Sequence, residues 1–575
     1  MVALAIVAAL GYAFAGEDAE AISVYPNGDT VAASAETGIV VRGAGPDDLG
    51  DVTVTGSESG EHAGRWTAHP DGDGAVFAPD DPFDPGEEVT VDADHPVAGA
   101  DGDKTSFTIA RTLDTPPPPF DKANPATDEH VQEFRSRPDL RPPQVEVRIR
   151  SAAATEGDVF VAPKRGATQV GPMILDDAGG LIWFHPLSGD LQAFDFRTQT
   201  YRDKPVLTWW EGKMRLYRGV GVGRILDTSY GEVATVRAGN GYELDAHEFQ
   251  LTDAGTALLI SYFPVPWDLT ELGGRKDGIV EDNVVQEVDI ETGAVLFEWH
   301  TLGTIPLGDS YRPAPTEAAQ MHDPWHLNSV TVDDDGDFIV SARHDSAIYK
   351  IDRETGDVVW RLGGKESDFE LDPGARFNLQ HDARVREDGA ITLFDNVSED
   401  VPANGRRSRA LALELDEQAM TASVAQWWEH PRDVLSGTQG SAQNLPGGGV
   451  FVGWGGLQPW FSEFSADGRP VFDAGFVPKE VESYRAYRGA WDGTGEGEPA
   501  ATLARAGGKT SVYASWNGAS DVASWRATPD GGEPVTAPRT GFETAIELPG
   551  APTVVSVEAL DAEGEVLATA DAASG

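Results

Sequence analysis

The chain of 575 residues contains no cysteine. This absence excludes disulfide bonds, thiolate zinc sites and cysteine nucleophiles. Basic residues are also scarce: 43 Lys and Arg stand against 95 Asp and Glu, for a formal net charge of −52. Nucleic acids and anionic membrane surfaces are polyanions, so neither is expected as a partner. The carboxylate excess predicts a halophilic protein kept soluble in high salt, which screens carboxylate repulsion; a high-GC codon bias is the alternative.

The N-terminus is apolar but lacks the basic residues that usually precede a signal sequence. Residues 1–16 end in the small-residue run Ala13-Phe14-Ala15-Gly16, which is similar to a signal-peptidase site. The stretch is too short for a membrane span of about twenty residues. It predicts an exported protein, extracellular or at the cell surface, with residues 1–16 as a signal or the remnant of a membrane anchor.

Composition divides the rest of the chain into four parts. Residues 21–112 and 500–575 read as short alternating strands separated by Asp, Gly and Pro turns, which predicts two β-sandwich domains of immunoglobulin-like or fibronectin-like type. Residues 113–144 form a proline-rich linker. The region 145–495 lies between the linker and the second sandwich and holds most of the Trp and His residues.

The region 145–495 contains tandem β units. Aligning the turn glycines Gly255, Gly336 and Gly389 brings three similar segments into register, and D-x-x-T-G-x-V turns recur at Asp289 and Asp352. Repeats of roughly forty to sixty residues made of strands are typical of β-propellers. The length leaves room for six blades or possibly seven, so the expected fold class is all-β, a six-bladed β-propeller with flanking sandwiches.

The alignment places polar residues at equivalent positions of three repeats. Eight residues before the glycines are His247, Asn328 and His381, and seven residues after them are Tyr262, Arg343 and Asn396. His326 lies two residues before Asn328, which would put both side chains on one face of an extended strand. Buried polar groups need partners, so this pattern predicts a polar central funnel that receives a ligand.

The residue types point to an oxyanion. Arg offers a planar fork of donors, His and Asn add more, and imidazole can act as nucleophile or proton carrier. No glycine-rich phosphate loop and no Asp cluster lies beside these positions, so no cofactor is expected. The alternative is a zinc or copper site of three imidazoles, which the interposed Arg343 disfavours. The run 333–337 resembles a calcium loop without its full spacing and is expected to be a solvated turn. His322, His344 and His430 have no repeat equivalents and are expected to be structural or supporting.

The same region resembles the arylsulfotransferase family. The stretches that carry the resemblance, in the family's order, are 171–176, 181–184, 205–212, 245–249, 326–330, 341–344, 359–365 and 380–384. The resemblance implies a six-bladed propeller in which a histidine takes the sulfuryl group from an aryl sulfate and passes it to a phenol, without a nucleotide. It assigns the nucleophile to His381.

The resemblance also assigns sulfate binding and proton transfer. These roles fall on His247, His326, Asn328 and Arg343, whereas Asn396 and Tyr262 come from the repeat alone. Well-known members carry a disulfide near the site and a single N-terminal β domain, so this cysteine-free chain with two flanking modules belongs to a divergent branch. Two alternatives remain: a non-catalytic surface propeller that binds sulfated or other anionic ligands, and a sulfate-ester hydrolase or lyase.

Overall fold

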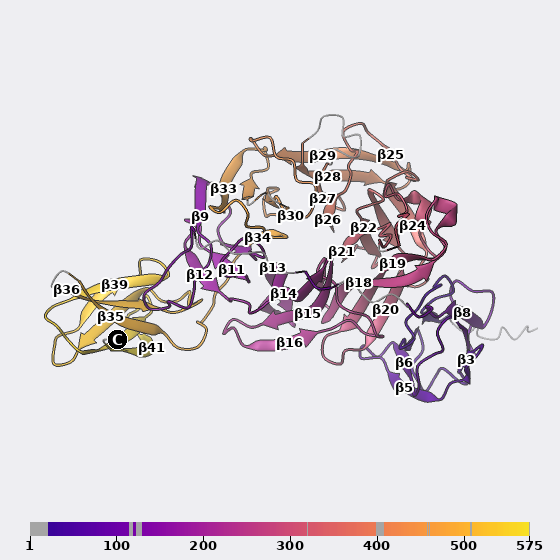
Figure 1. Cartoon of the computed structure of the whole chain (residues 1–575), viewed down its shortest axis with the longest axis horizontal. Coiled ribbons are helices and arrows are strands. Elements are labelled where there is room, and N and C mark those ends of the chain that lie inside the picture. Colours follow the sequence, from indigo (N-terminus) through magenta and orange to yellow (C-terminus); the bar gives the residue numbers. More distant parts are fainter. Residues whose placement is uncertain are drawn as a thin grey trace, which may run out of the picture.

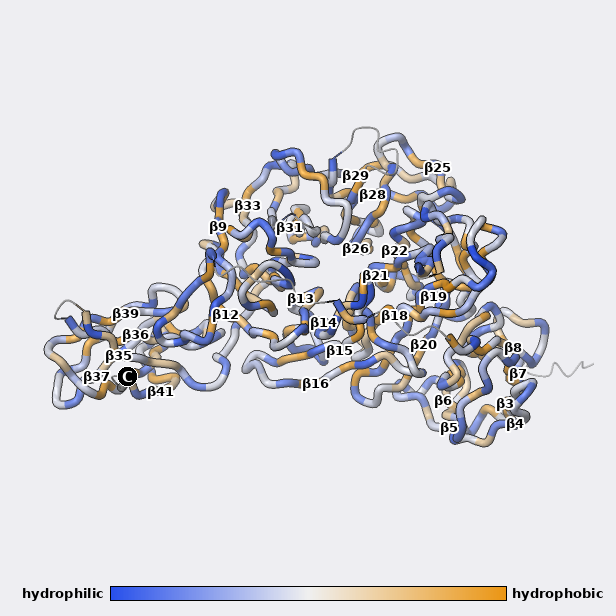
Figure 2. The backbone as a smooth tube through the Cα atoms, viewed as in Figure 1, coloured by the Kyte–Doolittle hydropathy of each residue, from blue (hydrophilic) through white to orange (hydrophobic). Residues whose placement is uncertain are grey.

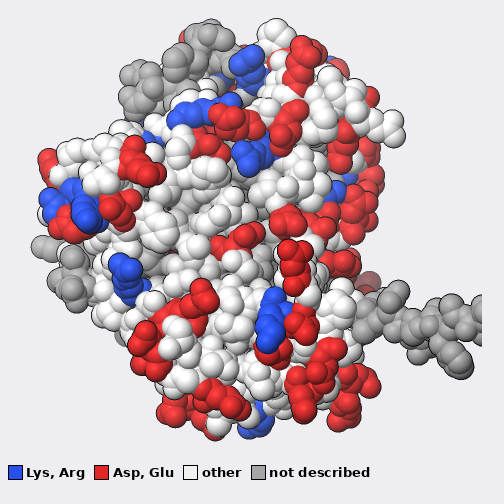
Figure 3. All heavy atoms as spheres, turned by 90° about the vertical axis from the view of Figure 1, so that its right-hand side faces the viewer, with Lys and Arg blue, Asp and Glu red and all other residues white. Residues whose placement is uncertain are grey.

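The computed structural model describes residues 21–113, 119–121, 129–318, 320–397, 407–456, 458, 460–506 and 509–573. These ranges are all-β, with two 3₁₀ turns, η1 (Thr270–Leu272) and η2 (Leu307–Asp309), and no α-helix. None of the helices in the described ranges could cross a membrane. The expected export segment, 1–16, and part of the expected linker lie outside the described residues. On the face shown in Figure 3, acidic residues clearly outnumber basic ones.

The N-terminal part consists of two four-stranded antiparallel sheets, ordered β1-β2-β6-β5 and β4-β3-β7-β8. The strands are β1 (Ser23–Tyr25), β2 (Ile39–Arg42), β3 (Thr53–Gly56), β4 (Gly60–Glu61), β5 (Gly64–Ala68), β6 (Gly74–Pro79), β7 (Glu88–Asp92) and β8 (Lys104–Thr108). Apolar residues alternate with polar ones along these strands, so Val89, Val91 and Phe107 point into one shared core.

The C-terminal part has a three-stranded sheet, β35-β36-β39, and a four-stranded sheet, β38-β37-β40-β41. The strands are β35 (Ala500–Ala506), β36 (Lys509–Ser515), β37 (Ser524–Pro529), β38 (Val535–Pro538), β39 (Glu543–Leu548), β40 (Val554–Leu560) and β41 (Val566–Ala573). Trp525, buried among Val512, Ile546 and Val557, fills the space between the sheets.

Six further sheets follow one another between these parts, each built on an antiparallel meander, and in the fifth of them β25 joins parallel to β29. The first three contain β10 (Asp158–Val161), β11 (Met173–Leu175) and β12 (Leu181–Phe184); β13 (Gln192–Tyr201), β14 (Lys204–Arg215), β15 (Arg218–Leu226) and β16 (Glu232–Val236); and β17 (Phe249–Leu251), β18 (Thr256–Trp267), β19 (Gly278–Asp289) and β20 (Val295–His300). Figure 1 shows the six sheets around a common centre, an arrangement of the β-propeller type.

The last three sheets continue the same order. They contain β21 (Leu327–Val332), β22 (Phe338–Ala342), β23 (Ala347–Ile351) and β24 (Val358–Gly363); β25 (Glu370–Leu371), β26 (His381–Val385), β27 (Ile391–Asp395), β28 (Arg409–Asp416) and β29 (Thr421–Glu429); and β30 (Ser441–Asn444), β31 (Val450–Gly453), β32 (Trp460–Phe464) and β33 (Pro470–Phe476). Apolar stretches, orange in Figure 2, run through these sheets.

Two strands join the ends of this series. β34 (Ala486–Gly489), late in the sequence, pairs with β10 as the innermost strand of the first sheet. β9 (Val145–Arg150), early in the sequence, pairs with β33 at the outer edge of the last sheet. The two ends of the central region are therefore each hydrogen-bonded into the sheet formed by the opposite end.

The aligned glycines occupy equivalent turns. Gly255, Gly336 and Gly389 connect the first and second strands of three successive sheets, with φ of 80°, 93° and 79°. This left-handed conformation is readily available only to glycine. In the other recurring turn, Asp289 Oδ1 accepts hydrogen bonds from the backbone N–H and the hydroxyl of Thr292. The two patterns noted in the sequence are thus two turns of one repeated meander.

The outer parts contact opposite sides of the central sheets, as Figure 1 shows. On the N-terminal side, Tyr25 OH donates to the carbonyl of Glu354 over 2.9 Å, and Asn240 Oδ1 accepts from the Gly38 N–H over 3.2 Å. On the C-terminal side, the Asn517 amide exchanges two 3.1 Å hydrogen bonds with the Phe184 backbone. These contacts leave the centre of the sheets uncovered.

Candidate active site

A cavity of about 870 Å³ opens where the six innermost strands begin. Each sheet contributes at least one residue at or just before its innermost strand, and these include Phe194, His247, His326, His381, Gln439 and Tyr484. Arg343 and His344 also line the cavity. Of the seven residues singled out in the sequence, the cavity wall contains His247, His326, Arg343 and His381.

His381 is held from both sides of its ring. Its Nδ1 lies 2.7 Å from Asn396 Oδ1, and its Nε2 accepts the backbone N–H of Gln439 over 3.1 Å. Asn396 uses its amide hydrogens on the carbonyls of Ser436 and Gln439, so its oxygen must face the ring. The proton therefore sits on Nδ1, and Nε2 carries a lone pair. Burial, then the nearby Arg343 charge, lowers the pKa of His381 well below its usual value, which keeps the ring neutral.

His247 and His326 each form a pair with an aspartate. Nδ1 of His247 is bonded to Asp245, and Nδ1 of His326 is bonded to Asp323. The two imidazole centroids lie 4.8 Å apart at 76°. Burial, with the charges of His247 and Arg343, lowers the pKa of His326 well below its usual value. An Asp–His pair can hold and release a proton, so each imidazole has a fixed orientation and a proton partner.

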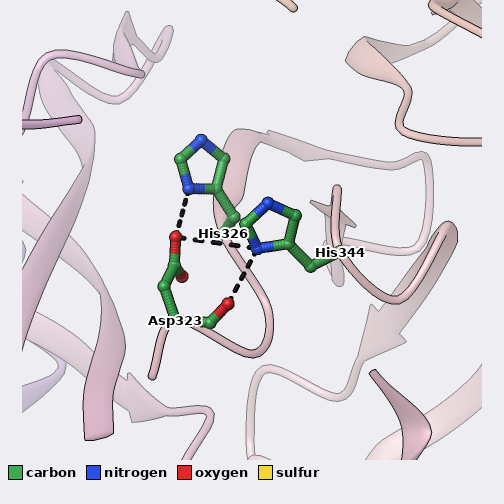
Figure 4. Close-up of side chains that lie close together, drawn as sticks. All are labelled: Asp323, His326 and His344. Carbon is green, nitrogen blue, oxygen red and sulfur yellow. Dashed lines mark hydrogen bonds and ion pairs between the residues drawn. The ribbon is translucent and has the colours of Figure 1, made fainter. Parts of the chain in front are cut away.

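Arg343 and His344 close one side of the cavity. Arg343 Nη1 donates to His344 Nε2 over 2.6 Å, and Nη2 donates to the Gly437 carbonyl over 2.7 Å. Nδ1 of His344 donates to the backbone carbonyl of Asp323, as Figure 4 shows. Burial lowers the pKa of Arg343 to about 10, so the guanidinium stays charged at neutral pH. His344 was expected to be structural or supporting; it lies on the wall, as does His322, and its hydrogen bond orients the arginine.

Asn328 and Tyr262 do not line the cavity. His326 has φ of 54° and precedes the first residue of β21, and the pairing of β21 with β22 shifts between Leu327 and Ser329. The expectation that His326 and Asn328 share a face of one extended strand was therefore wrong. Asn328 lies behind the wall and donates to the Gln380 carbonyl over 2.7 Å. Tyr262 packs behind His247, with centroids 5.4 Å apart, and donates to the Leu327 carbonyl.

Several groups at the site were not identified from the sequence. Asp245 and Asp323 lie two and three residues before the histidines that they orient, a spacing that could have indicated Asp–His pairs. Tyr484 and the backbone of Gln439 carried no such signal. They reach the cavity because β34 and β30 complete the ring of innermost strands.

The structure shows the surroundings of two possible metal sites, the histidine cluster and the 333–337 turn. Ligand atoms of Asp323, His326 and His344 lie within 4.8 Å of one another. His326 Nδ1 is already hydrogen-bonded to the Asp323 carboxylate, and both ring nitrogens of His344 are hydrogen-bonded to other groups. The fixed charge of Arg343 beside them opposes a dication. In the 333–337 turn, the Lys350 ammonium lies 2.8 Å from Asp333 and 2.6 Å from Asp335. A lysine thus occupies the centre of the calcium-like loop, which the sequence analysis had expected to be a solvated turn.

A layer of buried ion pairs lies behind the cavity. Arg485 is fully buried, donates to Asp195 over 2.8 Å and to the Asn328 carbonyl over 2.7 Å, and lies 3.3 Å from Glu248. Beyond this layer is a second cavity of about 400 Å³, lined by later residues of the same innermost strands, among them Arg384 and Tyr487. Arg485 therefore separates the two cavities.

The fold and the site define the class of protein: an all-β, propeller-like molecule with a His/Arg cavity at the start of its innermost strands. The family model of the arylsulfotransferases (ASST) matches residues 197–477. Over these residues, which include His247, His326, Arg343 and His381, the chain belongs to the arylsulfotransferase family.

No curated protein matches the chain. Similar solved structures include a protein of unknown function from Bacteroides caccae, at 11% identity over 58% of this chain and 99% of that one, with a TM-score of 0.36. They also include a catalytically inactive virginiamycin B lyase from Staphylococcus aureus, at 8% identity over 65% and 97% of the chains, with a TM-score of 0.30. These likenesses are too weak to bear on fold or activity.

Proposed function

We propose that this protein transfers a sulfuryl group from an aryl sulfate ester to a phenol, without a nucleotide, in the funnel of a six-bladed propeller flanked by two β-sandwich domains. The observation that carries the proposal is the setting of His381: a neutral imidazole, fixed through Nδ1 by Asn396, in the wall of a cavity that also holds Arg343 and two Asp–His pairs.

In the first step, His381 Nε2 gives up its hydrogen bond from the Gln439 N–H and attacks sulfur. An Nε2–S bond forms, the S–O bond to the aryl oxygen breaks, and the electron pair leaves with that oxygen. The imidazolium sulfonate keeps its proton on Nδ1, where Asn396 accepts it. The departing phenolate takes its proton from Nε2 of His247, whose Nδ1 is held by Asp245.

The second step reverses these movements with a new phenol. His247 takes the phenol proton, the phenolate oxygen attacks sulfur, and the electron pair of the S–N bond returns to Nε2. Arg343 and His326 lie on the same wall and would offset charge on the sulfuryl oxygens during both steps. Asn328, which lies behind the wall, would act through Arg485 and the Gln380 backbone rather than by contact with sulfate.

The test is transfer from 4-nitrophenyl sulfate to added phenol, with His381→Ala compared with His185→Ala. His185 is a half-exposed histidine outside the cavity wall and serves as the matched control. Phenol-dependent release of nitrophenolate that disappears only in His381→Ala supports the proposal. Release that does not depend on phenol would indicate a hydrolase or lyase. Binding of aryl sulfates without turnover would indicate a non-catalytic binding propeller.

We also propose that the protein works outside the cell in high salt, on the strength of residues 1–16 and the net charge of −52. Cell fractionation of the native host, combined with unfolding curves from low to molar KCl, tests both points. Protein found in the cytoplasm, or unfolding temperatures that do not rise with salt, would contradict them.

A further inference from the structure

The cavity wall is rich in basic groups for so acidic a chain. Acidic residues outnumber basic ones 95 to 43 overall, and they also outnumber them on the face shown in Figure 3. The basic residues on the wall are Lys164, Arg165, Arg312 and Arg343. Local cations in an anionic protein attract anions to one place on its surface. Four basic residues are more than one sulfuryl group requires.

Three of these cations already have partners. Arg343 donates to His344 and to the Gly437 carbonyl. Lys164 pairs with Glu482 over 2.8 Å, and Arg165 lies 4.0 Å from the same carboxylate. In the described part of the chain, the guanidinium of Arg312 has no ion pair and no hydrogen bond from its side chain. Its donors are therefore available to a ligand.

The backbone at Arg312 is tied to the catalytic cluster. The Arg312 N–H donates to Ser310 Oγ over 3.1 Å, and the Tyr311 N–H donates to the His344 carbonyl over 2.9 Å. Pro313 follows directly and restricts the backbone of Arg312 to an extended conformation. The Cα of Arg312 is thus fixed beside His344, whose ring contacts Arg343.

The cavity also has space for a substrate larger than a simple phenyl sulfate. Pockets of about 300–1,000 Å³ hold drug-sized ligands, and this cavity measures about 870 Å³. An aromatic ring with its sulfuryl group at His381 leaves room for a substituent that extends to the rim. Three carboxylates line the wall as well. Asp323 and Glu482 are paired with His326 and Lys164, and Asp121 Oδ1 accepts the Leu216 N–H over 2.9 Å.

We infer that Arg312 binds a second anionic group, a carboxylate, on the aromatic substrate. The substrates would be sulfate esters of phenols that carry a carboxylate away from the sulfated oxygen. This inference rests on the proposed sulfuryl transfer and adds the substrate class to it. A guanidinium forms two parallel hydrogen bonds with a carboxylate, which makes Arg312 selective for that group over a neutral one.

The test compares two donors that differ only in charge at that position: 4-sulfooxybenzoate and its methyl ester, both with phenol as acceptor. For the wild type we expect kcat/KM about tenfold higher for the carboxylate, as a charge-assisted hydrogen bond at an accessible rim would give. In Arg312→Gln the ratio should fall to near one, and Arg312→Lys should retain part of it. Arg165→Gln removes a paired cation from the same wall and should keep the wild-type ratio.

The outcomes separate the two proposals. Equal kcat/KM for both donors in the wild type, or an unchanged ratio in Arg312→Gln with its melting temperature intact, overturns the role of Arg312 and leaves sulfuryl transfer standing. No transfer from either donor, with folding verified by circular dichroism, overturns the proposed function itself.

Discussion

Asn396 Oδ1 and His381 Nδ1 lie 2.7 Å apart, and this hydrogen bond decides which nitrogen of the imidazole can react. The amide cannot rotate to offer its NH₂ group, because both of its hydrogens are donated to the Ser436 and Gln439 carbonyls. The residue that fixes the tautomer also anchors the loop that covers Nε2. The state of the nucleophile and the position of the loop are therefore linked.

Replacing Asn396 should reduce turnover more than substrate binding. In Asn396→Ala the ring of His381 can rotate or take the other tautomer, so we expect kcat to fall about 10- to 100-fold with little change in KM. Steady-state kinetics with 4-nitrophenyl sulfate measure this. Asn444→Ala, which removes an amide bonded to Thr392 on the far side of the innermost strands, is the control. A loss confined to KM would contradict the orienting role.

The value of kcat/KM for the donor should stay constant over an unusually wide range of pH. Burial lowers the pKa of His381 and His326 well below 6.5, so both stay neutral, and kcat/KM for the donor should hold steady as the pH falls through 6.5 and drop only below it. Burial lowers the pKa of Arg343 to about 10, so activity should fall as the pH rises through about 10 and the guanidinium loses its charge. A pH profile of donor kcat/KM checks both limits. An acidic limit above pH 6.5 would contradict the neutral resting state.

The lysine inside the aspartate turn leads to a prediction about calcium. Burial opposes the charge of Lys350, but hydrogen bonds to Asp333 and Asp335 raise its pKa, so the ammonium holds the turn together. Lys350→Met leaves three carboxylates facing one another, and the melting temperature of this variant should rise on addition of calcium. The wild type and Lys509→Met, which alters an exposed pair, should not respond. A calcium response of the wild type would show that Lys350 does not occupy the cation position.

Arg485 should be far more important to stability than an exposed arginine. Its removal leaves the carboxylates of Asp195 and Glu248 buried with less compensation, a change that costs about 3–5 kcal/mol of unfolding free energy. Denaturant unfolding of Arg485→Met, with Arg202→Ala as the exposed comparison, measures it. A difference of less than about 1 kcal/mol between the two would mean that water or rearranged Arg384 and Arg197 compensate for the loss.

The repeated strands and turns could be predicted well from the sequence, because the same residue pattern recurs along the chain. Gly255, Gly336 and Gly389 lie in equivalent turns, and the alignment based on them found His247 and His381, which reach the cavity. The same alignment ranked Asn328 above His326 as a repeat equivalent. It could not show that the left-handed backbone at His326 and the shifted pairing of β21 turn that side chain into the cavity instead.

The supporting groups were harder to predict because they come from distant parts of the chain. Arg485 reaches Asp195 across a separation of 290 residues, and Gln439 offers His381 a backbone N–H, which any residue type could supply. His344 had no equivalent in other repeats, so the alignment gave it no weight, yet it is bonded to Arg343. Contacts of this kind depend on how the six sheets are assembled rather than on any local pattern.

The ion pairs of Arg485 have a kinetic consequence, since they separate the site cavity from the one beyond it. Donor, released phenol and acceptor then share the cavity that contains His381 and occupy it one after another. Sulfuryl transfer through a covalent intermediate would follow a ping-pong scheme, with parallel lines in double-reciprocal plots. The first product and the acceptor would compete for the same sulfated form of the enzyme, so a phenol that is slow to leave would limit every later turnover.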